Sequence, residues 1–416
     1  MLKSKKQTRL LQYGRVFCYN SDMDKKVLIF STAYHPFIGG AEVAVKEITD
    51  RLSRKASDGE AEFQFDMITA RMNRGLSKFE KVGNVNVFRV GWGLGFLDKF
   101  SLPFLGYFKA KKLHGRNNYD LTWSIMASQA SIAASFFKKK FPAVKLVLTL
   151  QEGDEEEHFK RYVFGNDILY KILIRPWHLL IFKNADRTTA ISEYLKKRAV
   201  KNGVKDAVEI VPNGADIGLF SREYPEDELT ELKKELGKGP DDKFIITTSR
   251  LVKKNAVDDL IKSLIVLGGY FKILVVGDGP DMKKLRKLAK EIGAEKRVFF
   301  LGRVNYEDVP KYLKISDIFV RPSLSEGMGN SFIEAMAAGI PVIGTPVGGI
   351  VDFIKNGETG LFCDVKSPKS IADKVMILVQ NKSLSDRMVV SAKKMVVEKY
   401  DWNLVAQKMK NALSTD

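Results

Sequence analysis

The chain has 416 residues, of which 45% are hydrophobic and 28% are charged. These proportions are typical of globular proteins and exclude wholesale disorder, and the length predicts about two to three domains. The two cysteines, Cys18 and Cys363, are too few for a disulfide framework or a zinc site, which indicates a reducing, cytoplasmic environment. No apolar run approaches the ~18 residues of a membrane-spanning helix, and no signal peptide is predicted.

Positive charge is concentrated in the first half of the chain. The whole chain has a net charge of +18, from 68 Lys and Arg against 50 Asp and Glu. Residues 1–210 contribute +14 of this surplus and residues 211–416 only +4. A surplus confined to one half predicts that this half meets an anionic partner, which would be nucleic acid, an anionic membrane surface or a phosphorylated substrate.

Short apolar runs alternate with amphipathic segments after a basic N-terminal extension, residues 1–25. Helices are predicted between the runs, including Ala41–Lys55 and Ser192–Asn202, the second of them with Ser192 as its cap. The runs predicted as buried strands are Lys26–Ser31, Phe63–Thr69, Val85–Val90, Asp120–Ile125, Lys145–Leu150 and Arg187–Ile191.

The same alternation resumes after a turn-rich segment, Val211–Asp216, and a charged stretch, Glu223–Lys243. The strands predicted there are Phe244–Ser249, Lys272–Gly277, Val298–Leu301, Asp317–Val320 and Pro341–Gly344. Strand–helix alternation predicts parallel sheets with right-handed crossovers. The fold class is therefore α/β, with two Rossmann-like, doubly wound parallel-sheet domains facing a cleft.

Ligands of such sheets bind beyond the carboxyl ends of the strands, so the loops there are the candidate sites. The first loop, Ser31–Glu42, contains Gly39 and Gly40, which let backbone amides approach a ligand. The helix that follows offers free N–H groups to a phosphate or diphosphate. The alternative is a flexible strand-to-helix loop without a ligand. The loop is not the dinucleotide fingerprint, because it contains no G-x-G-x-x-G.

The second loop, Thr248–Ala256, carries three cations, Arg250, Lys253 and Lys254. Arg and Lys together can clamp a diphosphate and offset the charge that develops on a leaving group. Solvated surface lysines are the alternative.

The third loop, Arg321–Pro341, combines glycines with two carboxylates. Asn330 and Ser331 fall at a predicted helix start, with Glu334 in the first helical turn. Glu326 and Glu334 are predicted to face one cleft and to accept hydrogen bonds from sugar or ribose hydroxyls. The alternative is a loop carboxylate followed by a capping glutamate.

With these loops in place, the chain from about residue 26 to 416 resembles the retaining glycosyltransferases of family 4, which have the GT-B fold. The resemblance rests on five motifs: Gly39-Gly40-x-Glu42, Val211-Pro-Asn-Gly-Ala-Asp216, Ser249-Arg250-Leu251, Gly277-Asp-Gly-Pro280, and Glu326-x7-Glu334 followed by Ala-Met-Ala-x-Gly-x-Pro. It implies an N-terminal acceptor-binding domain over residues 26–212 and a C-terminal nucleotide-sugar-binding domain over residues 213–395. Residues 396–416 are then a helix that crosses back to the N-terminal domain.

The resemblance also assigns roles to the loop residues. Arg250 and Lys254 would hold the diphosphate, and Glu326 would bind the donor sugar hydroxyls; these three form the predicted catalytic set. Glu334 would bind the ribose. The predicted donor-binding residues are Gly39, Gly40, Gly329, Asn330, Ser331 and Glu334.

The chain departs from the family pattern at two places. The family usually has a Lys five residues after the Arg, where this chain has Asn255; we expect Lys254 to replace it, with Lys253 as the second choice.

Many members also have a His after the strand that corresponds to Lys145–Leu150, where this chain reads Gln151-Glu152-Gly153-Asp154. Either Gln151 replaces this His as an uncharged donor, or Glu152 or Asp154 acts on the acceptor side. His35 and His158 are further candidates.

The predicted function is retaining, metal-independent transfer of a sugar from a nucleotide-diphosphate sugar to a glycan or lipid-linked acceptor, without a cofactor. One alternative is a nucleotide-sugar epimerase of the same fold, against which the third loop argues. The other is a basic nucleic-acid-binding protein, but no nucleic-acid-binding module is present and no nucleic acid is expected as a partner.

Three basic segments rich in aromatic and aliphatic residues lie in the N-terminal half: Phe96–His114, Ser135–Phe141 and Leu169–Lys183. Such segments suit docking onto an anionic bilayer. In the third segment, Lys171, Arg175 and His178 form one polar stripe on an apolar helix that Pro176 interrupts, and a buried helix with a basic edge is the alternative. The predicted location is cytoplasmic and peripheral, on the inner face of the membrane.

Overall fold

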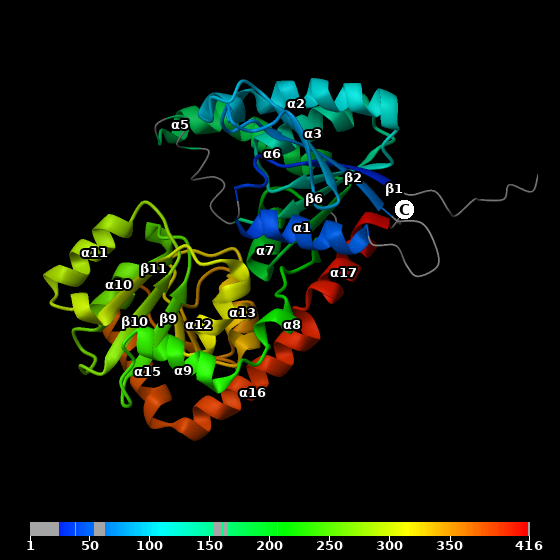
Figure 1. Cartoon of the computed structure of the whole chain (residues 1–416). Coiled ribbons are helices and arrows are strands. Elements are labelled where there is room, and N and C mark those ends of the chain that lie inside the picture. Colours follow the sequence, from blue (N-terminus) through cyan, green and yellow to red (C-terminus); the bar gives the residue numbers. More distant parts are fainter. Residues whose placement is uncertain are drawn as a thin grey trace, which may run out of the picture.

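The computed structural model describes residues 25–37, 39–53, 63–152, 160, 163, 165–205 and 207–414. Residues 1–24 of the predicted extension, Asp154 and His158 therefore lie outside the described residues. The chain forms two α/β units, one above the other in Figure 1, and each is built around one sheet.

The first unit has an eight-stranded sheet in the order β3-β4-β2-β1-β5-β6-β7-β8. Its strands are β1 (Lys25–Phe30), β2 (Phe63–Ala70), β3 (Phe79–Val82), β4 (Val85–Val90), β5 (Leu121–Ile125), β6 (Lys145–Leu150), β7 (Arg187–Ala190) and β8 (Glu209–Ile210). All neighbouring strands are parallel except β3 and β4. The two edge strands, β3 and β8, were not predicted because neither contains an apolar run.

Alternate residues of β1 enter different hydrophobic layers. Val27 and Ile29 pack in the layer of α1 (Gly40–Leu52) and α17 (Trp402–Ser414). Leu28 and Phe30 pack in the layer of α2 (Phe96–Asn117) and α3 (Gln129–Lys140). Because both faces of the sheet are covered, its inner strands consist mainly of buried apolar and threonine residues, and this is why the sequence predicted them.

The second unit has a six-stranded parallel sheet in the order β11-β10-β9-β12-β13-β14. Its strands are β9 (Lys243–Thr248), β10 (Phe271–Val276), β11 (Val298–Gly302), β12 (Ile318–Arg321), β13 (Val342–Gly344) and β14 (Leu361–Phe362). One face packs with α12 (Val309–Lys314), α13 (Asn330–Ala338) and α16 (Lys382–Lys399), and the other with α10 (Val257–Ser263), α11 (Met282–Glu291) and α15 (Pro368–Gln380). Two doubly wound α/β sheets are thus confirmed.

Shorter helices complete the chain. They are α5 (Asp167–Leu169), α6 (Arg175–Asn184), α7 (Glu193–Lys201), α8 (Ile217–Phe220), α9 (Glu226–Glu235) and α14 (Ile350–Phe353), with a π-helical turn at Tyr170–Ile174 and 3-10 turns at Lys253–Asn255, Glu295–Arg297 and Tyr306–Asp308. The Ser192 hydroxyl accepts the Leu195 N–H at 3.3 Å, so the predicted cap of α7 is confirmed. Within the described residues, no helix is long and apolar enough to cross a membrane.

The chain passes between the two units at two places that lie side by side. The Ala215 N–H donates to the Tyr400 carbonyl at 2.9 Å. Only glycine fits at position 214, because a Cβ there would lie 2.7 Å from the Tyr400 carbonyl oxygen and 2.9 Å from the Trp402 ring. After this crossing, α17 packs on the first unit. The boundaries 26–212, 213–395 and 396–416 stay predictions.

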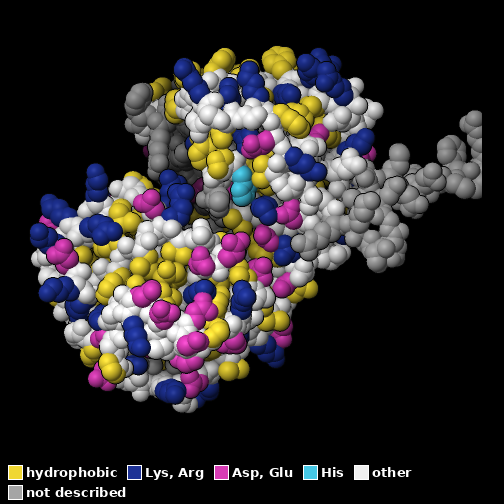
Figure 2. Space-filling model, viewed as in Figure 1, with side chains coloured by type: hydrophobic (Ala, Val, Ile, Leu, Met, Phe, Trp, Pro, Cys, Tyr) yellow, Lys and Arg dark blue, Asp and Glu magenta, His cyan; other side chains and the backbone are white. Residues whose placement is uncertain are grey.

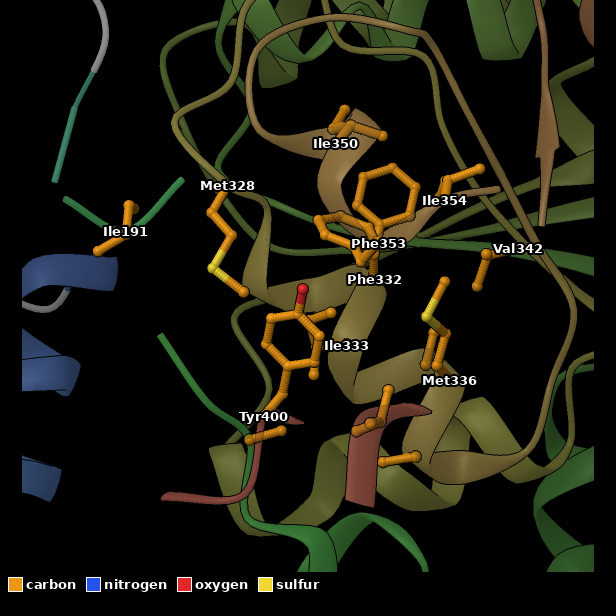
Figure 3. Close-up of a cluster of buried hydrophobic side chains, with 14 of the residues drawn as sticks. Ile191, Met328, Phe332, Ile333, Met336, Val342, Ile350, Phe353, Ile354 and Tyr400 are labelled. Atoms are coloured by element: carbon orange, nitrogen blue, oxygen red, sulfur yellow. The ribbon is translucent and has the colours of Figure 1, made fainter. Parts of the chain in front are cut away.

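One hydrophobic cluster continues from the first unit into the second. It includes Ile191 after β7 and Met328 before α13, and Figure 3 shows Met328 on the side of the cluster that is nearest to Ile191. Gly327 lies so close to the first unit that a Cβ would be 2.7 Å from the Gln151 carbonyl oxygen. The loop before α13 therefore closes tightly onto the end of β6.

Two expectations about helices were wrong. Segment 169–183 is not one helix interrupted by Pro176: a π-helical turn precedes α6, and Pro176 lies in the first turn of α6. Lys171 and Arg175 are exposed, but His178 is buried and packs against the ring of Phe182, so the three residues do not form one polar stripe. In addition, α13 begins at Asn330, so Glu334 lies beyond its first turn.

Candidate active site

The candidate site lies where loops from the carboxyl ends of both sheets approach one another. From the first unit come the β1–α1 loop and Gln151–Glu152 after β6, and from the second unit come the loops after β9 and β12. Helix N-termini point toward the same edge of a parallel sheet, so this region favours anionic ligands. Three sets of contacts organise it.

The first set is a row of amide side chains that joins the two units. Gln151 and Asn213 form two reciprocal hydrogen bonds, at 3.1 Å and 2.9 Å, and both residues are buried. The Asn213 Nδ2 also donates to the Asn330 Oδ1 at 3.3 Å. Gln151 therefore uses both polar ends of its side chain on Asn213, and its suggested role as a substitute for the family His stays a prediction.

The β1–α1 loop meets the same row. A Cβ on Gly40 would lie 3.9 Å from the Asn330 Nδ2, and Gly39 is the N-cap residue of α1. Burial raises the pKa of Glu42 and the nearby Glu152 raises it further, whereas the backbone N–H groups of Gly39 and Glu42 and the charge of Lys99 act in the opposite direction.

The cations of the loop after β9 differ in their surroundings. Lys254 pairs with Glu152 across the two units at 2.9 Å. Arg250 and Lys253 are exposed, and neither side chain pairs with an acidic group in the described residues. Arg250 can therefore bind an anion without breaking an ion pair with a described residue. Lys254 would either bind the anion while still paired with Glu152 or first break that ion pair.

The second set of contacts centres on Arg321, which the sequence had not singled out. Its guanidinium donates to the Ser331 Oγ at 2.8 Å, the Asn255 Oδ1 at 3.0 Å and the Glu326 Oε2 at 2.9 Å. The side chain is buried, and among the residues that the structure describes its Nε has no hydrogen-bond partner.

Asn255, in turn, donates from its Nδ2 to the Arg250 carbonyl at 2.6 Å. Arg321 therefore fixes the loop after β9, the Glu326 carboxylate and the start of α13 relative to one another. The only signal for it in the sequence is an arginine that ends an apolar strand.

The third set joins Glu334 to Tyr306, which the sequence had also missed. Burial raises the pKa of the Glu334 carboxyl to about 7, while a hydrogen bond from Tyr306 and the charge of Arg321 act to lower it. The pKa of the Tyr306 hydroxyl is raised as well, first by burial and then by nearby carboxylates, among which Glu334 is the strongest.

The start of α13 needs a glycine. Gly329 has φ of +99°, in the left-handed region, and precedes Asn330 and Ser331, the first two residues of the helix. This conformation directs the chain from Glu326 into α13 within three residues.

The structure thus brings the predicted residues together in groups. Arg321 joins Glu326 to Ser331, Asn213 joins Gln151 to Asn330, and the Lys254 side chain pairs with Glu152. Asp154 falls outside the described residues. In the part of the chain that the structure describes, no group of three or more His, Cys, Asp or Glu residues has the arrangement of a metal site.

Comparisons with known proteins agree with this arrangement. Residues 229–395 match the family model described as "Glycosyl transferases group 1", and residues 38–219 match "Glycosyltransferase Family 4". The chain is 31% identical over 300 residues to the N-acetyl-alpha-D-glucosaminyl L-malate synthase of Bacillus anthracis, covering 70% of this chain and 74% of that protein.

It is also 29% identical over 242 residues to the GDP-mannose-dependent alpha-(1-6)-phosphatidylinositol monomannoside mannosyltransferase of Mycobacterium tuberculosis, covering 56% and 62% of the two chains.

Solved structures share the fold. Anabaena HepE in complex with UDP-glucose superposes with a TM-score of 0.75 at 20% identity and covers 94% of this chain and 99% of its own. WaaG, a glycosyltransferase involved in lipopolysaccharide biosynthesis, superposes with a TM-score of 0.70 at 16% identity, with 94% and 100% covered. The predicted GT-B fold is confirmed.

Proposed function

The chain belongs to glycosyltransferase family 4 and is a glycosyltransferase, and we propose that it transfers a sugar, with retention, from a nucleotide-diphosphate sugar to a glycan or lipid-linked acceptor. The observation that carries this proposal is the Arg321 network, which fixes Glu326, Ser331 and the Arg250 loop around one edge of the second sheet. The named relatives and solved structures include a GDP-mannose-dependent enzyme and a UDP-glucose complex. None of them is named as an epimerase or a nucleic-acid-binding protein.

The donor is proposed to lie against the second unit. Arg250, which has no acidic partner in the described residues, and Lys254 would neutralise the diphosphate and so stabilise it as a leaving group. Lys254 would exchange Glu152 for the phosphate when the donor binds. The N–H groups at the start of α13, at Asn330 and Ser331, would add the positive end of the helix dipole.

The two carboxylates are proposed to hold the hydroxyl groups of the donor. Glu326, oriented by Arg321, would accept hydrogen bonds from the sugar, and Glu334 from the ribose. Gly39 and Gly40 would close over the diphosphate from the first unit, where the absence of a side chain leaves room beside Asn330. The reaction is proposed to need neither metal nor cofactor.

The acceptor is proposed to bind in the first unit, next to Glu152. The acceptors named for the relatives differ, since one protein is an L-malate synthase and another acts on a phosphatidylinositol mannoside. The positive charge of the first 210 residues fits an anionic or lipid-linked acceptor better than a neutral one. We therefore place the enzyme on the cytoplasmic side, peripheral to the membrane.

A thermal-unfolding screen with UDP, GDP and ADP and their sugars tests the donor proposal. A true donor nucleotide at about 100 times its Kd should stabilise the protein by about 2.7 kcal/mol. Arg250→Gln should weaken that ligand at least about tenfold, because a charge-assisted contact to phosphate is lost. Lys287→Gln, an exposed α11 lysine paired with Glu291, is the matched control and should change nothing. If no nucleotide raises the unfolding temperature, the donor proposal fails.

The same screen decides between the two lysines, because Lys253→Gln and Lys254→Gln can be compared directly.

Retention and metal independence are tested on the product. The anomeric configuration read by NMR should match that of the donor, and excess chelator should leave the rate unchanged. Inversion of the anomer or loss of the rate would contradict the respective part of the proposal.

A further inference from the structure

The outer face of α2 is apolar, although it faces solvent. Phe96, Phe100, Phe104 and Phe108 recur every four residues, and each is between 57% and 64% exposed. The opposite face of the helix, which includes Leu102, Ala110 and Leu113, packs in the core. A helix at the surface of a globular protein normally turns polar residues outward, so packing of the core does not account for this exposed aromatic row.

A second exposed apolar area adjoins the row. Ile172 in the π-helical turn is 65% exposed and Trp177 in α6 is 45% exposed. The two areas meet through Phe136 of α3, whose ring lies 6.0 Å from that of Phe104 and 5.7 Å from that of Trp177. We call the combined face, made of Phe96, Phe100, Phe104, Phe108, Ile172 and Trp177, the aromatic face.

In the described parts of α2, α3 and residues 165–184, the exposed charges are nearly all positive. The exposed cations are Lys111, Lys112 and Arg116 at the end of α2, Lys139 and Lys140 in α3, and Lys171, Arg175 and Lys183 near α6. α2, α3 and residues 165–184 contain two acidic residues. Asp98 is buried and accepts the Trp92 and Leu94 N–H groups, and Asp167 pairs with Lys160. Figure 2 shows basic and hydrophobic side chains interspersed along this upper edge of the molecule.

We propose that the aromatic face docks onto an anionic lipid bilayer, with the phenylalanines at the level of the acyl chains and the lysines at the headgroups. Aromatic and aliphatic side chains gain by leaving water, and each nearby cation is attracted to anionic headgroups. A second copy of this chain would fit less well, because two such faces would bring their cations together. The biological purpose of this docking rests on the proposed lipid-linked acceptor. Its physical basis, exposed aromatic side chains next to cations, does not depend on that acceptor.

The position of the face relative to the site supports this purpose. α2 begins directly after β4, at the same sheet edge as Gly39 and Gln151. Lys99 in its first turn is close enough to Glu42 to lower the pKa of that carboxyl. Docking through α2 would therefore hold the proposed acceptor side of the site close to the bilayer, where a lipid-linked acceptor resides.

The chain carries its own reporter for the test. Of its four tryptophans, Trp123 and Trp402 are 1% exposed, whereas Trp92, just before α2, and Trp177 are exposed. Adding vesicles of phosphatidylcholine with about one third phosphatidylglycerol should shift the fluorescence of the full chain to the blue, and the protein should sediment with the vesicles. Pure phosphatidylcholine and high salt should weaken both effects.

Two variants and one control locate the surface. Phe100→Ser/Phe104→Ser/Phe108→Ser should lower the partition coefficient at least about tenfold on any vesicle. Lys111→Glu/Lys112→Glu should remove most of the preference for phosphatidylglycerol. The control Val390→Ser/Val397→Ser changes two exposed apolar residues of α16 in the other unit and should bind as the unchanged protein does.

Three results would overturn the proposal. The first is no binding to anionic vesicles at low salt, and the second is full binding by the triple phenylalanine variant. The third is light scattering that shows the unchanged protein as a dimer and the triple variant as a monomer. Nucleotide-induced thermal stabilisation, measured on the same samples, keeps the two proposals apart. Vesicle binding without any nucleotide response would overturn the donor proposal alone. A nucleotide response without vesicle binding would overturn docking alone.

Discussion

Glu334, the proposed ribose-binding residue, carries a charge that the folded state disfavours. Its carboxylate is partly buried and its pKa is raised to about 7 from an ordinary value of 4.5, because burial disfavours the charge. A raised pKa means that the folded state holds the proton more tightly than the unfolded state. The protonated Glu334 carboxyl therefore contributes fully to the free energy of unfolding below about pH 4.5, and this contribution is lost as the pH rises through about 7.

We expect Glu334→Gln to raise the free energy of unfolding by about 1–3 kcal/mol at pH 8, where the charge is removed, and to have little effect near pH 5. Nucleotide affinity should rise with pH through about 7 in the unchanged protein, because only the ionised carboxylate accepts two ribose hydrogen bonds, and should be flat in the variant. Denaturant unfolding and calorimetric titration across this range measure both. Glu307→Gln, an exposed neighbour of Tyr306, is the control, and equal pH dependence in both variants would contradict the prediction.

The residue types of the site were predictable from the sequence, but their partners were not. Glu326, Ser331 and Glu334 are marked by one contiguous motif, so a local pattern is enough to find them. Arg321 bonds to Asn255, which is 66 residues away, and Tyr306 bonds to Glu334 from a separate 3-10 turn. Such pairs depend on which strand lies next to which, and periodicity within one segment does not contain that information.

At the scale of elements, the entry into α13 depends on Gly329. An alanine there would have to adopt a left-handed φ, and its Cβ would lie 3.0 Å from the Phe332 ring and 3.3 Å from the Glu326 Cγ. Gly329→Ala should destabilise the protein by about 1–2 kcal/mol through strain. It should also lower nucleotide affinity, because Glu326 and the first N–H groups of α13 are displaced together.

The matched control is Gly237→Ala after α9. Gly237 also has a positive φ, +62°, but no atom of the described residues lies within 4 Å of its added Cβ. Thermal unfolding and nucleotide titration should show a similar loss of stability in both variants and a loss of affinity in Gly329→Ala only. If Gly329→Ala binds nucleotide normally, the placement of the donor at the start of α13 is wrong.

The elements that were not predicted from the sequence lack a local signal in their own residues. β3, β8 and β14 are short edge strands that gain their identity from a neighbour rather than from an apolar run. The π-helical turn at Tyr170–Ile174 widens the helix locally, and the amino-acid composition of this segment does not predict it. The edge strands are thus decided by pairing with a distant or neighbouring strand, which no single segment of sequence contains.

At the scale of the whole molecule, stability depends on the two places where the chain crosses between the units. Trp402, which follows the second crossing, is 1% exposed, lies against Gly214 of the first crossing and belongs to the core that α17 forms with the first unit. Trp402→Ala should lower the free energy of unfolding by about 3–5 kcal/mol, because a large cavity opens there. Urea unfolding measures this, with the exposed Trp177→Ala as a control that should stay within about 0.5 kcal/mol. Equal losses in the two variants would contradict this account of the crossings.

The sequence by itself determined the α/β class, the two strand–helix series and the family motifs, because each is written into a short run of residues whose spacing is fixed by strand and helix geometry. Tertiary structure alone decided which groups of the two units meet and which face of α2 is turned to solvent. Both faces of α2 are apolar, so its sequence cannot say whether Leu102 or Phe104 is buried. Packing against β2 and α3 selects the first, and this choice leaves the row of phenylalanines exposed.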